Sequence, residues 1–198
     1  MSNSVIVKNK ISCFKKEIIV PGDKSISIRW VLFSSLASGT SRATNLLHSE
    51  DVIAAINAIK KFGIKVFLNK RICKIYGKGI DGYNFKKNII LDAKNSGTLG
   101  RLILGIIINT PFPIKIIGDQ SLSKRDFKRI ADPLTKFGAK FELNKGKGLP
   151  LKIFGAKKLQ PIKYLEKKGS AQCKSAVIFG AMRAGNTTII KAKKSRNH

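Results

Sequence analysis

Acidic residues are scarce in this sequence. Only 11 Asp and Glu stand against 39 Lys and Arg, so the formal net charge is +28 at pH 7. Such an excess favours an anionic partner, whether nucleic acid, an anionic surface or an anionic metabolite. Nucleic acid fits poorly, because the lysines are scattered and there is no long basic tail, zinc-finger spacing or aromatic RNA-binding signature. We therefore expect no nucleic-acid partner, although a non-catalytic, basic anion-binding or nucleic-acid-binding domain stays open as an alternative.

Cysteine and histidine are also scarce. Cys13, Cys73 and Cys173 are odd in number, far apart and without a CxxC pair. This pattern argues against a disulfide framework and favours a reducing, cytoplasmic location. His48 and His198 have no neighbour in sequence that indicates catalysis, and His48 precedes a predicted helix cap.

Long apolar runs are absent. The longest, residues 102–108, is far too short to span a bilayer. The first ten residues, MSNSVIVKNK, lack the apolar segment and cleavage site of a signal peptide. We expect a protein with no membrane partner. With 43% hydrophobic and 25% charged residues in 198 positions, the chain has the composition of a globular domain.

The most informative stretch that is present is PGDKSISIR, residues 21–29. A β-rich run at residues 17–20 stops at Pro21-Gly22, and an apolar run follows at residues 30–33. This pattern predicts a strand, a tight turn and a helix that Ser25 or Ser27 caps. Lys24 and Arg29 add charge to a helix N-terminus, which suits a phosphate or carboxylate. An ordinary serine cap with solvated basic residues explains the stretch equally well.

The pattern recurs with a period of roughly seventy residues. Turns at residues 95–98 and 169–172 take the place of the Lys24-Ser25 turn, and KKFGIKV at residues 60–66 parallels TKFGAKF at residues 135–141. We predict three βαβαββ units, at about residues 21–84, 85–157 and 158–198, the last of them incomplete. The predicted helices are 26–37, 52–62, 102–108, 121–137 and 175–182; the predicted strands are 18–20, 40–47, 64–68, 72–76, 140–143, 151–154 and 187–191.

The first helix of each unit is apolar nearly all round, at residues 30–33, 102–104 and 176–179. Such helices are expected to be buried. The second helices alternate apolar and basic residues and are expected to be half exposed. The sequence thus predicts an α/β fold with buried parallel helices inside, sheets outside, and three helix N-termini that converge on one anionic site.

Five separated motifs then point to a known family: PGDKSISIR, NSGTLGRL, GDQSLSKR, GSAQCKSA and KSRNH. Their order and spacing resemble those of the 5-enolpyruvylshikimate-3-phosphate synthases from about residue 18 to the last residue. The UDP-N-acetylglucosamine enolpyruvyl transferases are less similar, because they have Lys-Asn where this chain has Lys24-Ser25. They also use a cysteine in the loop that follows Gly118 here, and this chain has none in that loop.

The resemblance implies a transferase that joins phosphoenolpyruvate to the 5-hydroxyl of shikimate 3-phosphate and releases phosphate, without metal or organic cofactor. It implies an enolpyruvyl transferase lobe with a truncated third unit, in a protein that is monomeric at full length. The chain is less than half as long as that family's proteins. The missing half carries the acid–base carboxylate and lysine and packs with residues 1–20, so we expect the chain alone to be inactive.

The resemblance also assigns residues. Lys24 is implied to be catalytic and to touch both substrates. The positions implied to bind shikimate 3-phosphate are Lys24, Ser25, Arg29, Ser170, Ala171, Gln172, Ser195 and Arg196. Those implied to bind phosphoenolpyruvate are Lys24, Gly97, Arg125 and Gln172. Thr98 and Arg101 match the motif and are interpreted as support for the helix start, and Asp126 stands where the family usually has proline.

Overall fold

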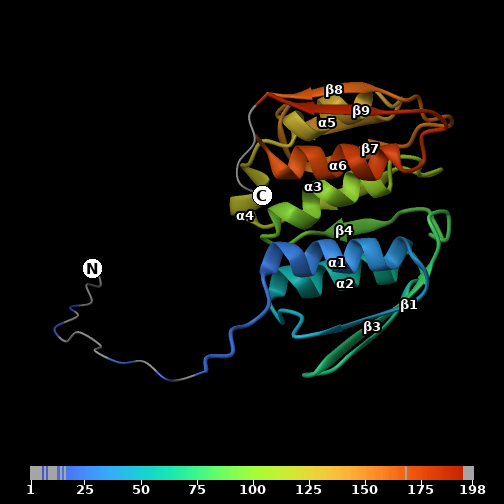
Figure 1. The fold of residues 1–198 in the computed structure, drawn as a ribbon. Helices are drawn as coiled ribbons and strands as arrows, with labels where there is room; N and C mark the ends of the chain where they lie inside the picture. The colour runs from blue at the N-terminus through green and yellow to red at the C-terminus, as the bar shows by residue number, and fades with distance from the viewer. Residues whose placement is uncertain are drawn as a thin grey trace.

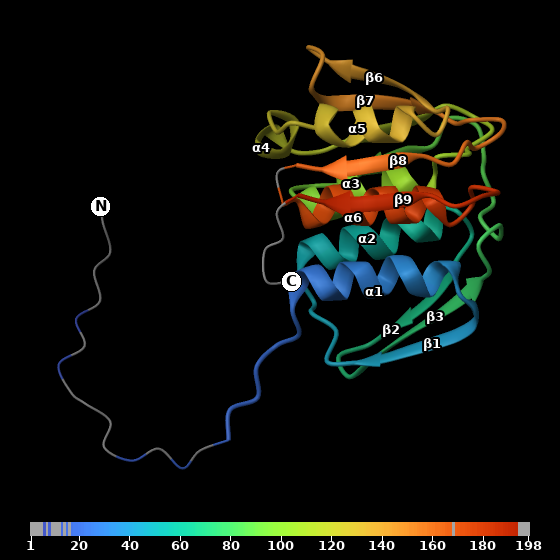
Figure 2. The ribbon, with the colours of Figure 1, turned by 45° about the horizontal axis from the view of Figure 1, so that its top comes forward.

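The computed structural model describes residues 6, 8, 13, 15, 17–167 and 169–193. Five longer helices lie side by side between separate sheets (Figures 1 and 2). They are α1 (Lys24–Leu36), α2 (Glu50–Lys61), α3 (Gly97–Ile106), α5 (Lys128–Thr135) and α6 (Ala171–Ala181). The expected arrangement, with helices inside and sheets outside, is therefore confirmed.

One sheet falls within each predicted unit. The first contains β1 (Ser38–Thr44), β2 (Lys65–Leu68) and β3 (Ile72–Lys78) in the antiparallel order β1-β3-β2. The predicted strands at residues 64–68 and 72–76 are confirmed as β2 and β3, which pair as a hairpin. β1 ends before residue 47, since Asn45 has a positive φ of 56° that breaks the extended chain.

The second sheet has the order β4-β5-β7-β6, with β4 (Ile90–Asp92) parallel to β5 (Ile114–Ile117). The antiparallel strands β6 (Lys140–Asn144) and β7 (Gly148–Phe154) were expected from the sequence. The third sheet pairs β8 (Lys163–Glu166) with β9 (Ile189–Ala192) in parallel. Among the described residues, no helix is long and apolar enough to cross a membrane.

The predicted helix over residues 121–137 is wrong. The segment forms the single turn α4 (Gln120–Ser123) and, after a break, α5. The Asp119 side chain caps α4 by accepting the Leu122 N–H at 2.7 Å, and the Phe127 N–H donates to the Lys147 carbonyl at 2.7 Å. Because that N–H points to a neighbouring segment, the backbone leaves the helical path before α5 begins.

Two predictions around α1 are also corrected. Residues 18–20 form no strand; Ile19 is 87% exposed, and this part of the chain leads away from the body (Figure 1). No described strand lies beside it to complete its backbone hydrogen bonds. The helix is capped by Asp23 instead of a serine, since the Asp23 carboxylate accepts the Ile26 N–H at 2.7 Å. A carboxylate in this position also complements the positive end of the helix.

Burial differs among the first helices. All ten residues of α3 are buried, as predicted. α1 and α6 are buried on one side only, and Phe33 and Ile178 are 45% and 44% exposed. The reason is the arrangement of the second helices: α2 packs against α1 and α5 against α6, while among the described residues no helix covers the outer seam between α1 and α6. The expectation of all-round burial is wrong for these two helices.

The closest helix contact joins α3 and α6. A Cβ added to Gly105 would lie 2.1 Å from the Ala176 carbonyl oxygen and 3.0 Å from the Phe179 Cβ. The first atom belongs to the backbone and the second to the buried Phe179 side chain, so neither can shift away easily in a close-packed interior. Gly105 therefore sets the distance between the two helices.

We predict that Gly105→Ala lowers the free energy of unfolding by at least about 2 kcal/mol, because overpacking of a close helix contact forces backbone shifts. Chemical denaturation followed by circular dichroism measures the change. Gly185→Ala is the matched control, as its Cβ would meet nothing within 4 Å. Equal stability of the two variants would show that the α3–α6 contact is loose.

Candidate anion-binding site

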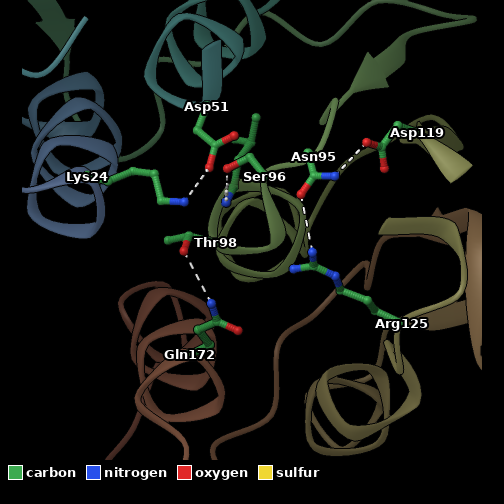
Figure 3. A network of polar contacts seen from close by, with 9 residues as sticks. Lys24, Asp51, Asn95, Ser96, Thr98, Asp119, Arg125 and Gln172 are labelled. Carbon is green, nitrogen blue, oxygen red and sulfur yellow. Dashed lines mark hydrogen bonds and ion pairs between the residues drawn. The ribbon is translucent and has the colours of Figure 1, made fainter. Parts of the chain in front are cut away.

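The N-termini of α1, α2, α3 and α6 gather at one end of the helix layer. Figure 3 looks along the helices, and the residues labelled on them belong to their first turns or caps. Three of the caps are alike, since Asp23, Ser96 and Ser170 each accept the N–H three residues further on, at 2.7, 3.3 and 3.2 Å. The expected convergence of helix ends is thus present, and it concentrates partial positive charge at one place.

A groove of about 760 Å³ runs between α1 and α6. It brings together Ser25 and Arg29 from α1 with Ala171 and Gln172 from α6, four of the residues that the sequence assigned to one substrate. The remaining lining residues are Asp23, Ile26, Lys174, Ser175 and Ile178. Both helices therefore contribute basic and hydrogen-bonding side chains to the groove, together with one isoleucine each.

Arg29 spans this groove. Its guanidinium donates to the Ser25 carbonyl at 3.2 Å on its own helix and to the Ser175 hydroxyl at 3.4 Å on α6. Partial burial lowers the pKa of Arg29 from its usual value, and the nearby Asp23 carboxylate opposes that effect. Both hydrogen-bond partners are neutral, so among the described residues Arg29 forms no direct ion pair, and the charge that Asp23 does not offset can attract an anion.

Lys24 lies outside the groove lining, and its ammonium forms an ion pair with Asp51 of α2 at 3.0 Å. Figure 3 shows both side chains pointing toward the start of α3. The lysine is 54% exposed, so the pair is accessible to solvent. The sequence did not indicate Asp51 as a partner of Lys24, because only a helix cap was predicted after His48.

Arg125 is held in place by a short relay of polar groups. Its Nη2 donates to the Asn95 Oδ1 at 3.2 Å, and the Asn95 Nδ2 donates to the Asp119 Oδ2 at 2.5 Å (Figure 3). The hydrogen bonds from the Leu122 N–H and the Asn95 amide lower the pKa of Asp119. The relay fixes Arg125 at the N-terminus of α3.

Gly97 leaves room for two guanidiniums. A Cβ at this position would lie 2.9 Å from the Arg101 Nη1 and 3.3 Å from the Arg125 Nη1. The absence of a side chain at Gly97 therefore lets two arginine side chains approach the backbone closely. Both guanidiniums therefore lie beside the N-terminus of α3.

Arg101 is the residue that the sequence analysis undervalued. It is 6% exposed, donates to the Gln172 Oε1 at 2.7 Å and to the Asp126 carbonyl at 3.4 Å, and lies 5.1 Å from the centroid of the Phe127 ring. Burial, followed by the charges of Arg129 and Arg125, lowers the pKa of Arg101 to about 10. The sequence signal that could have indicated this buried role is a lone arginine in an otherwise apolar helix.

Ser170 caps α6, and its backbone N–H donates to the Glu166 Oε2 at 2.9 Å. Its Oγ accepts the Cys173 N–H, and the hydroxyl hydrogen has no partner among the described residues. Ser195, Arg196 and His198 lie outside the described residues. His48 is exposed. Among the residues that the structure describes, no group of three or more His, Cys, Asp and Glu side chains is placed to hold a metal ion.

Fold and site together define an α/β lobe with a candidate anion-binding groove. The sequence model of one protein family, EPSP synthase (3-phosphoshikimate 1-carboxyvinyltransferase), matches residues 8–198. The chain belongs to this family.

Relatives and solved structures agree. The 3-phosphoshikimate 1-carboxyvinyltransferase of Streptococcus agalactiae serotype Ia is 44% identical over 186 residues, which cover 93% of this chain and 43% of the relative. That of Bacillus subtilis strain 168 is 40% identical, over 96% of this chain and 45% of the relative. The EPSP synthase structure from Acinetobacter baumannii superposes with a TM-score of 0.87 at 33% identity, over 93% of this chain and 42% of that one. The chain thus spans less than half the length of these relatives.

We predict that Lys24→Ala weakens binding of inorganic phosphate about tenfold or more, since a charged donor beside the helix N-termini is lost. The free energy of unfolding should change by less than about 1 kcal/mol, because exposed ion pairs contribute little. Calorimetric titration and thermal melts measure the two effects. Lys65→Ala, which removes a lysine over the Tyr76 ring in the outer hairpin, is the control for charge alone. A large loss of stability with unchanged binding would make Lys24 a structural residue.

Proposed function

We propose that this chain supplies the shikimate 3-phosphate-binding lobe of a 3-phosphoshikimate 1-carboxyvinyltransferase. The whole enzyme joins the 5-hydroxyl oxygen of shikimate 3-phosphate to the enol carbon of phosphoenolpyruvate and releases phosphate. The observation that carries the proposal is the groove between α1 and α6, where Ser25, Arg29, Ala171 and Gln172 meet at helix N-termini. Its support is the family match over residues 8–198.

The chemistry of the groove suits this substrate. A ring with hydroxyl groups and a phosphate needs hydroxyl and amide partners together with cationic donors for the phosphate. Ser25 and Gln172 supply the hydroxyl and the amide, Arg29 supplies the cation, and the Ser170 hydroxyl lies at the start of α6. Ile26 and Ile178 give the carbon ring an apolar surface.

Phosphoenolpyruvate is proposed to bind at the start of α3. Arg125 and the backbone beside Gly97 face this end, and Arg101 adds a third positive feature behind them. The charges of the two substrates repel each other, so a reaction between them requires preorganised positive groups. The Lys24 side chain extends from α1 toward the start of α3 in Figure 3, and we propose that it contacts both substrates. We also infer a cytoplasmic location, which the free thiols Cys13, Cys73 and Cys173 support.

The test is a titration of the 198-residue chain with shikimate 3-phosphate, followed by calorimetry and by amide NMR. We expect saturable binding with shifts concentrated at residues 25–29 and 170–175. Shikimate without the phosphate should bind at least about tenfold more weakly, because the charge-assisted hydrogen bonds are lost. UDP-N-acetylglucosamine should produce no matching shifts. Equal affinity for shikimate and its phosphate, or shifts only on the outer sheets, would contradict the proposal.

A second prediction separates binding from turnover. The carboxylate that lines the groove is Asp23, and its Oδ1 already accepts the Ile26 N–H. General acid–base groups contribute about 10²–10⁴ in rate, and the one carboxylate in the described groove lining is already used as a helix cap. We therefore expect the chain, given both substrates, to release no phosphate above the background of the substrates alone. Phosphate release that requires the protein and both substrates would show that the acid–base groups lie within these residues.

A further inference from the structure

The side-chain amide of Gln172 is held between two helices. On one side the Arg101 Nη1 donates to its Oε1 at 2.7 Å. On the other its Nε2 donates to the Thr98 Oγ1 at 3.2 Å, as Figure 3 shows. Both partners belong to the first turns of α3, whereas Gln172 belongs to the first turn of α6 and lines the groove.

Arg101 determines which way round this amide lies. A guanidinium has donors only, so it can face the oxygen of an amide but not its NH₂ group. Arg101 is itself immobile, since it is buried, stacked on Phe127 and bonded to the Asp126 carbonyl. A flipped amide would set two donors against a buried positive charge, which is costly in a site of low dielectric constant.

The amide therefore has one N–H left. A primary amide carries two N–H donors, and Thr98 takes one of them. We propose that Arg101 and Thr98 are positioning residues that turn the remaining Gln172 N–H toward the groove, where it selects an oxyanion of the substrate. This inference rests on the proposed function. It gives Arg101 and Thr98 a role in substrate selection, in addition to their support of the start of α3.

Helix geometry explains how these residues meet. Thr98 lies about two turns and Arg101 about one turn before Gly105, so all three share one face of α3. Gln172 lies about one turn before Ala176, whose carbonyl touches Gly105. The close contact of α3 and α6 thereby places the Gln172 amide between its two partners.

Two conservative pairs of variants test the inference in the 198-residue chain. Arg101→Met removes the donors and keeps the length of the side chain, while Arg101→Lys keeps a charge and a donor. Thr98→Val removes the acceptor and keeps the shape, while Thr98→Ser keeps the acceptor. Arg42→Met, at an exposed position of β1, controls for the loss of one positive charge. Thermal melts verify that each variant is folded.

The first readout needs no ligand. In the wild-type chain the two Gln172 side-chain N–H resonances should be well dispersed and slow to exchange with water. Arg101→Met and Thr98→Val should move them toward the values of a free amide, whereas Arg101→Lys, Thr98→Ser and Arg42→Met should not. Unchanged resonances in both Arg101→Met and Thr98→Val would overturn the inference. If Arg101→Met does not fold, the Thr98 pair decides alone.

The second readout is the dissociation constant for shikimate 3-phosphate. We expect Arg101→Met to raise it about tenfold, the order of one hydrogen bond to a charged group. Arg101→Lys should restore most of the affinity, and Arg42→Met should leave it unchanged. A wild-type chain that does not bind refutes the proposed function, while the amide resonances still decide the positioning role. Wild-type affinity in a folded Arg101→Met chain overturns the inference.

Discussion

The contact of Gly105 with the Ala176 carbonyl is the constraint on which the site depends. Helices with larger side chains at this crossing would stand further apart. The Gln172 amide of α6 would then lie further from both Arg101 and Thr98 of α3, and both hydrogen bonds would weaken. A glycine in mid-helix costs about 1 kcal/mol relative to alanine. The packing of α3 against α6, all of it buried on the α3 side, offsets that cost.

Much of the fold was predictable because each repeated unit has local sequence patterns that are typical of helices and strands. Alternating residues gave the β2–β3 and β6–β7 hairpins, and apolar runs gave α1, α3 and α6. The failures are tertiary. A β-rich run at residues 18–20 has no strand beside it, and the helix at residues 121–137 breaks where the Phe127 N–H finds a partner in another segment. The apolar surfaces of α1 and α6 did not reveal which side another helix would cover.

The site divides in a similar way. Four residues of the groove were predictable because their motifs resemble those of a known family, and the structure brings them together. The contacts of Asp51 and Arg101 were not predicted, because the partner of a charged side chain depends on which helices pack together. Arg101 most resembled a surface residue by type, yet it is among the few buried charged residues described. Sequence patterns locate helix starts well, whereas they do not show what lies across from them.

The partial burial of Arg29 in the groove has a consequence for how the protein handles its charge. At +28 the whole surface attracts anions of every kind, and salt at physiological ionic strength largely screens such attraction beyond about 8 Å. Arg29 is partly buried, and this burial lowers its pKa. Because partly buried charges are screened less than exposed ones, salt weakens the field of that arginine less than the fields of the exposed surface lysines. As ionic strength rises, anions therefore dissociate from the surface lysines before they dissociate from the groove. The groove then binds its anion more selectively relative to the rest of the surface.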